Sequence, residues 1–185
     1  MRRLRRRIAD SVVLAEDETI IRLFPPLRYA WTLRGEQAQV PISGRNDQRS
    51  LFGALNIQTG RRILMNAARP RQGPFQDFLR RLRRHYRAGR IYLLLDKSRP
   101  HQAAKSQTLA RQLDMELIWL PTQTPKLNAM DHLWKELKKE MLPNHQFEPV
   151  EQAVDYALSW TRALTNRQAL KKGGLLSKNN WLKSI

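Results

Sequence analysis

Three carboxylates follow or open segments that the sequence predicts to be buried. Asp17 comes after the apolar run 12–15, Asp96 directly follows the apolar run 91–95, and Asp131 lies at the start of an amphipathic helix. A carboxylate at the end of a buried strand is costly to desolvate unless a partner neutralises it. Three converging carboxylates would suit Mg²⁺, a hard cation that prefers oxygen ligands. Enzymes that break phosphodiester bonds commonly use such a metal site.

Each of these acids also has an ordinary structural explanation. With Asn128 as the N-cap, Asp131 occupies the third position of its helix, where the positive helix end favours an acid. Asp96 would instead cap the turn at residues 97–100. This explanation is weaker for Asp96, because the three leucines before it draw it towards the interior.

Asp17 stands between Glu16 and Glu18, so one of three neighbouring acids must be chosen as the site residue. Strand alternation puts Asp17 on one face of the sheet and both glutamates on the other. An acid at the start of a turn is the structural alternative for Asp17.

The composition points to a polyanionic partner. The chain has 185 residues, which suits one domain with a small appendage, and 41% of them are hydrophobic, enough for a core. The net charge of +18 favours nucleic acid, bound through its phosphates without sequence preference, over a membrane surface. The absence of cysteine excludes disulfides and thiolate zinc sites and fits a reducing cytoplasm.

No segment of the sequence indicates membrane insertion or export. The longest apolar runs have the length of strands, far below the roughly 20 residues of a spanning helix. The basic stretch 2–7 is charged enough for the start of a signal peptide, but the apolar stretch after it is short and meets Glu16.

The first half of the chain carries strand patterns around an irregular excursion. Residues 12–17 and 50–57 are rich in strand formers, and a turn after the second run leads into a partner strand at 62–67. Residues 22–45 predict an irregular excursion with a short strand near Val40. The three strands predict an antiparallel meander.

The second half alternates helix and strand patterns. Apolar residues at helical spacing predict a helix at about 75–86. Its opposite face carries Arg80, Arg81, Arg84 and Arg87. The run 90–95 is apolar on both faces, which is typical of a strand covered on both sides. The other predicted elements are a helix at 103–113, a short strand at 116–119, helices at 130–141 and 149–164, and a loose basic tail at 171–185.

This order predicts an α/β fold with a mixed five-stranded sheet and helices on both faces. Ligands of such sheets gather beyond the carboxyl ends of the strands, where Asp96 lies. We divide the chain into a basic arm at 1–10, a catalytic domain at 11–145, and a C-terminal helix with a basic tail at 146–185.

Three short phrases surround the acids. Residues 17–19 read DET, residues 96–101 read DKSRPH, and residues 120–134 read LPTQTPKLNAMDHLW, with 34 residues between Asp96 and Asp131. They resemble the phrases DE-S/T, D-N-x-x-x-H and LPPYSPxLNPIEHLW in the catalytic domain of mariner-like insertion-sequence transposases, the superfamily with a DDE or DDD triad. The resemblance covers about residues 11–142, and its third phrase is the most specific because it is long.

The resemblance implies a ribonuclease H-like fold in which Asp17, Asp96 and Asp131 hold two Mg²⁺ or Mn²⁺ ions about 4 Å apart. It implies a transposase that hydrolyses a DNA strand at the element's end and then joins that end to target DNA. We further expect a homodimer that brings two ends together. Because only ten residues precede the first strand, we also expect an upstream helix-turn-helix half that reads the ends. The expected location is the bacterial cytoplasm, on the nucleoid.

The chain departs from the family at three points. Lys97 stands where the family often has Asn, Asp131 stands where many relatives have Glu, and Ala129 with Met130 replaces Pro-Ile. Related mariner elements use Asp at the third position of the triad. These departures leave a truncated or decayed copy as an alternative.

Seven residues are candidates for contacts with DNA, and several have a structural alternative. They are Arg80, Arg81, Arg84, Arg87, Lys97, His101 and Asn128. His101 is alternatively a structural histidine, and Asn128 is alternatively a helix cap. Trp31 either stacks on a splayed base or lies in the core.

Three other interpretations stay open. Another ribonuclease H-like nuclease, acting on RNA–DNA hybrids or branched DNA, would cleave without joining strands. A catalytically dead, basic DNA-binding remnant would bind in a salt-sensitive way without metal-dependent chemistry. A ribosomal or nucleoid structural protein would explain the charge and leave the three acids without a role.

Overall fold

The structure, a computed structural model, describes most of the chain. The described residues are 11–23, 31–37, 39, 44–122, 124–141 and 147–177. The basic arm predicted at 1–10, the short strand predicted near Val40 and the last part of the predicted tail lie outside these residues.

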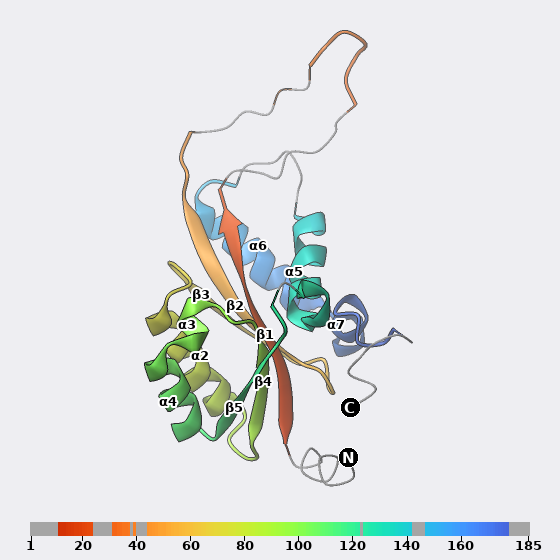
Figure 1. Cartoon of the computed structure of the whole chain (residues 1–185). Coiled ribbons are helices and arrows are strands. Elements are labelled where there is room, and N and C mark those ends of the chain that lie inside the picture. Colours follow the sequence, from red (N-terminus) through yellow and green to blue (C-terminus); the bar gives the residue numbers. More distant parts are fainter. Residues whose placement is uncertain are drawn as a thin grey trace.

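A five-stranded mixed sheet forms the centre of the fold, in the order β3-β2-β1-β4-β5 (Figure 1). β1, β2 and β3 pair in antiparallel fashion, whereas β4 and β5 run parallel to β1. The mixed five-stranded sheet expected from the sequence is confirmed. Its strands are β1 (Val12–Arg22), β2 (Gln48–Asn56), β3 (Arg62–Ala67), β4 (Ile91–Leu95) and β5 (Met115–Trp119).

β1 is longer than the sequence predicts. The apolar pattern ends near residue 17, where the chain becomes acidic, but pairing with β2 continues as far as Arg22 opposite Gln48. Long-range hydrogen bonding therefore extends the strand beyond the end of its local pattern. The three neighbouring acids consequently lie in the middle of a strand and alternate between its two faces.

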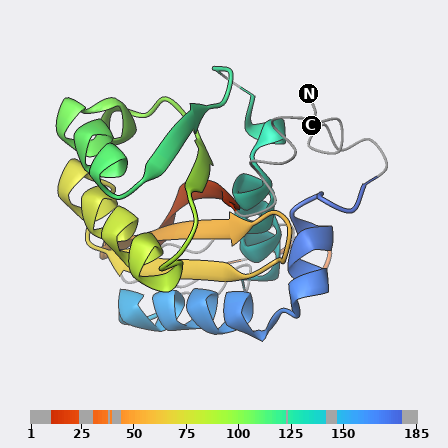
Figure 2. The same ribbon diagram turned by 90° about the horizontal axis from the view of Figure 1, so that it is seen from below.

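Helices cover both faces of the sheet, as the sequence predicts (Figure 2). One face carries α2 (Gln72–His85), α3 (Arg99–Gln102) and α4 (Ala104–Gln112). The other carries α5 (Ala129–Glu140), α6 (Val150–Ala163) and α7 (Asn166–Lys172), with the short 3₁₀ turn η1 (Pro125–Leu127) before α5. The buried side chains accordingly form two hydrophobic clusters, one on each face. Residues of α6 and α7 belong to the same cluster as those of α5.

The sequence analysis missed α3 and α7. Residue 165 begins a Thr-x-x-Gln capping box, in which the Thr165 side chain and the Gln168 side chain each satisfy the other's backbone N–H. This signal was present in the sequence. Leu175, beyond α7, is also buried. The loose tail expected from residue 171 is therefore wrong for the residues described up to 177.

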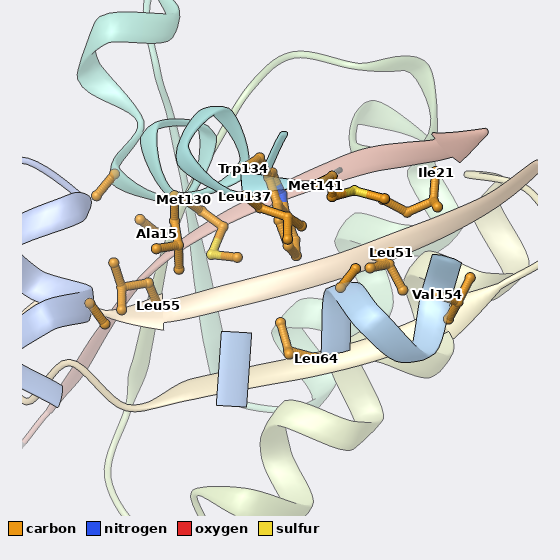
Figure 3. Close-up of a cluster of buried hydrophobic side chains, with 14 of the residues drawn as sticks. Ala15, Ile21, Leu51, Leu55, Leu64, Met130, Trp134, Leu137, Met141 and Val154 are labelled. Atoms are coloured by element: carbon orange, nitrogen blue, oxygen red, sulfur yellow. The ribbon is translucent and has the colours of Figure 1, made fainter. Parts of the chain in front are cut away.

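Close packing of α5 on the sheet depends on Gly53 of β2. Figure 3 shows Met130 and Trp134 of α5 pointing towards the sheet within the larger buried cluster. A Cβ atom at Gly53 would lie 2.4 Å from Met130 Cε and 2.5 Å from Trp134 Cζ2. Gly53 is the direct partner of Asp17 in the β1–β2 ladder, and the Trp134 indole N–H donates to the Asp17 carbonyl at 3.3 Å. The missing side chain thus lets α5 approach the strand that carries Asp17.

We predict that Gly53→Ala lowers the free energy of unfolding by about 1–3 kcal/mol, because the rigid indole of Trp134 must move to make room for the methyl group. Urea denaturation followed by tryptophan fluorescence measures the change. Gly73→Ala is the matched control, since a Cβ there meets nothing within 4 Å. Equal stability of the two variants would contradict this packing argument.

Candidate active site

All three predicted acids line one cleft, with a volume of about 430 Å³. Asp17 comes from the middle of β1, Asp96 directly follows β4, and Asp131 lies in the first turn of α5. Lys97 and Asn128 line the same cleft, as does Glu18. The structure therefore brings together the three acids that the sequence placed on separate elements.

Parallel pairing of β1 with β4 brings Asp17 and Asp96 to the same level. Ala15 pairs with Leu94, and the two aspartates each follow two residues later on their own chains. Neighbouring strands lie about 4.8 Å apart, so the two backbones are close at this point. Asp96 is more exposed than Asp17 because β4 has already ended, whereas β1 continues beside β2.

Asn128 fixes the start of α5 next to Asp17. Its side-chain oxygen accepts the Met130 N–H at 3.0 Å, and its side-chain nitrogen donates to the Glu16 carbonyl at 2.7 Å. This N-cap puts Asp131 at the third helical position, as predicted. Asn128 is only 4% exposed, and both its polar atoms are used within the protein. Its alternative role as a cap is confirmed, and its contact with DNA stays a prediction.

The cleft concentrates negative charge. Burial raises the pKa of Asp17 well above its usual range, and the charges of Glu18, Asp131 and Asp96 raise it further. Asp131 has a counter-charge one turn along its helix, since Lys135 Nζ lies 2.6 Å from Asp131 Oδ2. Carboxylate oxygens that repel one another in a polar cleft form a donor set that hard divalent cations prefer. Asp17, Asp96 and Asp131 thus fit Mg²⁺ or Mn²⁺.

A second group of polar side chains lies behind the cleft, around His101 of α3. The ring Nδ1 lies 2.9 Å from Asp96 Oδ1, and Nε2 lies 3.1 Å from Glu18 Oε1 and 3.5 Å from Glu16 Oε2. The histidine side chain is 1% exposed and Glu16 is fully buried. His101 is thus buried among acidic side chains of the protein, which favours the structural alternative over the predicted contact with DNA.

The charges around His101 favour an imidazolium. Burial alone would lower the pKa of His101, but the charge of Glu16 and the hydrogen bonds with Asp96 and Glu18 outweigh burial and raise the pKa to about 11. The hydrogen bond from His101 in turn lowers the pKa of Asp96. His101 therefore connects the buried glutamate pair of β1 to the Asp96 carboxylate and holds one of its oxygens in place.

Sequence reasoning assigned Glu16 and Glu18 to the face opposite Asp17, and the structure bears this out, because both contact His101 of α3. It did not assign them a role. Their partner lies more than 80 residues away in the chain, so no local pattern links them. The available signal was the spacing from Asp96 to His101, which lets the histidine fold back onto the acid.

The four arginines predicted to share a face at 80–87 do not form one surface. Arg80 pairs with Asp77 at 2.9 Å, whereas Arg81 and Arg84 line a different cavity, and Arg87 is exposed beyond the end of the helix. Trp31 is fully exposed, so it is not a core residue. Within the described part of the chain, no helix has the length and apolar character needed to cross a membrane.

Residues 12–153 match the sequence family described as DDE superfamily endonuclease. The chain belongs to this family. An insertion element IS630 uncharacterized 39 kDa protein from Shigella sonnei is 31% identical over 140 residues, which are 75% of this chain and 41% of the relative. The chain thus spans about two fifths of the length of that curated relative.

Solved structures of the Mos1 transposase share the fold. A paired-end complex with the left transposon end has a TM-score of 0.71 at 17% identity, covering 95% of this chain and 55% of that chain. The mariner Mos1 paired-end complex with Mg has a TM-score of 0.70 at 19% identity, covering 94% and 54%. The Mos1 catalytic domain has a TM-score of 0.62 at 16% identity, covering 89% and 76%. The likeness confirms the expected ribonuclease H-like fold.

We predict that His101→Gln lowers the free energy of unfolding by about 3–5 kcal/mol, because it leaves the fully buried carboxylate of Glu16 without its cationic partner. The double variant Glu16→Gln/His101→Gln should regain part of the free energy of unfolding that His101→Gln loses. A double-mutant cycle by urea denaturation should give a coupling above about 1 kcal/mol.

The exposed pair Arg80 and Asp77 is the matched control for this cycle. Its coupling should stay below about 1 kcal/mol, since solvent screens an exposed ion pair. Additive effects of Glu16→Gln and His101→Gln would contradict the charge pairing behind the cleft.

Proposed function

We propose that this chain is the catalytic domain of a transposase, which cuts DNA strands by metal-dependent phosphoryl transfer and joins them to target DNA. Asp17, Asp96 and Asp131 are its catalytic, metal-binding residues. The observation that carries this proposal is that all three acids line one cleft. Membership of the DDE superfamily endonucleases supports the same reaction class.

Two Mg²⁺ or Mn²⁺ ions would occupy the cleft, held by the three aspartates. When bound, such ions activate an attacking water or hydroxyl and neutralise charge on the leaving oxygen of an in-line displacement. Burial and the charges of the neighbouring acids raise the pKa of Asp17, so a cation next to its carboxylate would be stabilised there. The structures of Mos1 complexes with Mg and with Mn support a metal of this class.

Other residues of the chain would position the reacting groups. His101 holds Asp96 Oδ1 at 2.9 Å and the Ser98 N–H donates to the same oxygen at 3.0 Å, so the second oxygen of Asp96 stays available to the cleft. Lys97 is exposed and lines the cleft, where its ammonium group would bind a phosphate next to the one being cut. Asn128 keeps Asp131 at the level of Asp17 through its bond to β1.

The substrate would be DNA, consistent with the net charge of +18. Mos1 structures in complex with a transposon end support this by analogy. We infer that a helix-turn-helix region outside residues 1–185 reads the element's ends and that a homodimer brings two ends together. The positive charge would also keep the protein on the bacterial nucleoid.

We predict that Asp96→Asn reduces the nicking of supercoiled plasmid in Mn²⁺ to the level of an EDTA control, while binding to the same DNA is retained. The substitution keeps the shape of the side chain and removes the charge that would hold the metal. Asp155→Asn is the matched control, because Asp155 is exposed on α6 and lies outside the cleft. Retained nicking by Asp96→Asn would rule out the assigned site.

Strand joining separates the proposed function from its rivals. Incubation of a pre-cut element end with target plasmid in Mn²⁺ should yield joined products for a transposase. Cleavage without joining would indicate another ribonuclease H-like nuclease. Salt-sensitive binding without nicking, even after an end-reading region is supplied, would indicate a catalytically dead remnant.

A further inference from the structure

A second cavity, strongly basic and about 510 Å³ in volume, lies at the outer edge of β3. We call it the β3-edge pocket. Two apolar residues of β3 form part of its wall. Its basic residues come from β3, from the C-terminal half of α2 and from the last turn of α6, and they are Arg62, Arg81, Arg84, His85 and Arg162.

The β3-edge pocket is separate from the carboxylate cleft. The two cavities share no lining residue. Leu64 of the pocket pairs with Gly53, which pairs with Asp17, so two strand spacings of about 5 Å each separate their backbones, and Asp96 lies one strand further. Figure 2 shows α2 and α6 on either side of β3. The carboxylate cleft and the β3-edge pocket are therefore two distinct cavities.

The basic side chains of the pocket lack acidic partners. Arg81, Arg84 and Arg162 are exposed, and none forms an ion pair with an acid in the part of the chain that the structure describes. In contrast, Arg80 on the same helix pairs with Asp77, and Arg49 pairs with Glu151. Guanidinium groups from two helices that face one cavity without a carboxylate repel one another, and an anion would relieve that repulsion.

Arg62 gives the pocket a fixed wall. It is half-buried, and its guanidinium donates to the Gly60 carbonyl at 2.7 Å, the Leu164 carbonyl at 2.5 Å and Asn166 Oδ1 at 3.0 Å. These bonds tie the start of β3 to the chain between α6 and α7. The position of Arg162 relative to α2 is thereby held by the fold, and the site does not need to assemble from flexible side chains alone.

The chemistry of the lining favours backbone phosphates over a nucleotide. Among the described residues that line the pocket, no Phe, Tyr or Trp ring provides a large stacking surface for a base, and most of the lining is guanidinium. Guanidinium groups bind phosphate oxygens through paired hydrogen bonds without reading sequence. The net charge of +18 makes DNA the polyanion that the whole chain would attract.

We propose that the β3-edge pocket is a second DNA-binding site, which holds backbone phosphates of a DNA segment other than the strand in the carboxylate cleft. Arg81, Arg84 and Arg162 bind the phosphates, and Arg62 positions the wall. The proposal rests on the proposed function only in taking DNA as the ligand.

The test compares Arg81→Ala/Arg84→Ala/Arg162→Ala with the matched variant Arg69→Ala/Arg71→Ala/Arg111→Ala, which removes the same charge from exposed positions outside both cavities. Fluorescence anisotropy with a 30-base-pair duplex measures affinity at several salt concentrations. EDTA is present, so cleavage plays no part. The pocket variant should flatten the slope of log K against log salt by roughly 2–3, at about 0.9 for each lost phosphate contact. The control should change it by less than about 1.

Equal changes in the two variants, or no change in the pocket variant, would overturn the proposal. The pocket variant could instead lose its binding of inorganic pyrophosphate while the salt dependence of its duplex binding stays unchanged. That result would assign the pocket to a small anion and would also overturn the proposal. Arg62 is left intact because its hydrogen bonds support the fold. The plasmid-nicking assay tests the proposed function independently, because that function fails if no Asp96-dependent nicking occurs in Mn²⁺.

Discussion

Negative charge gathered where β1 and β4 run side by side is the constraint on which the rest of the structure depends. Parallel pairing brings Asp17 level with Asp96, and Glu16 and Glu18 add two more acids to the same strand. Burial and the neighbouring acids raise the pKa of Asp17 and of Glu16 well above the usual range, so both carboxylates are unstable as anions without counter-charges. On one face of the sheet, the imidazolium of His101 provides a positive charge that pairs with Glu16 and Glu18. The start of α5 packs on the other face.

The side chains on the two faces of the sheet therefore stabilise the site in different ways. On the α3 face, His101 neutralises the buried glutamates and orients Asp96. On the α5 face, Asn128 and Trp134 bond to the carbonyls of β1 on successive residues, and Gly53 leaves the space for Trp134. Asp131 thereby reaches the cleft from a helix anchored to the strand that carries Asp17. The charge that remains uncompensated in the cleft is the charge that a divalent cation would neutralise.

Local patterns in the sequence were sufficient for the sheet and for the three acids, because strand ends and helix starts are marked by periodicity and by the phrases around Asp17, Asp96 and Asp131. Local patterns did not predict the role of a polar side chain where that role depends on its burial in the folded protein. His101 and Asn128 were assigned to DNA because they stand near the site in sequence, yet each is buried with protein partners. The arginines at 80–87 were grouped by helix face, but Arg81 and Arg84 line the β3-edge pocket, whereas Arg80 pairs with Asp77 outside it.

The measurement that tests the central claim most directly is the binding of Mn²⁺ to the chain, followed by electron paramagnetic resonance without DNA. The account predicts two bound ions for each chain and the loss of at least one in Asp96→Asn. Glu116→Gln should bind like the unaltered protein, because Glu116 is exposed on β5 outside the cleft. The same number of ions, bound with the same affinity by Asp96→Asn, would contradict the account.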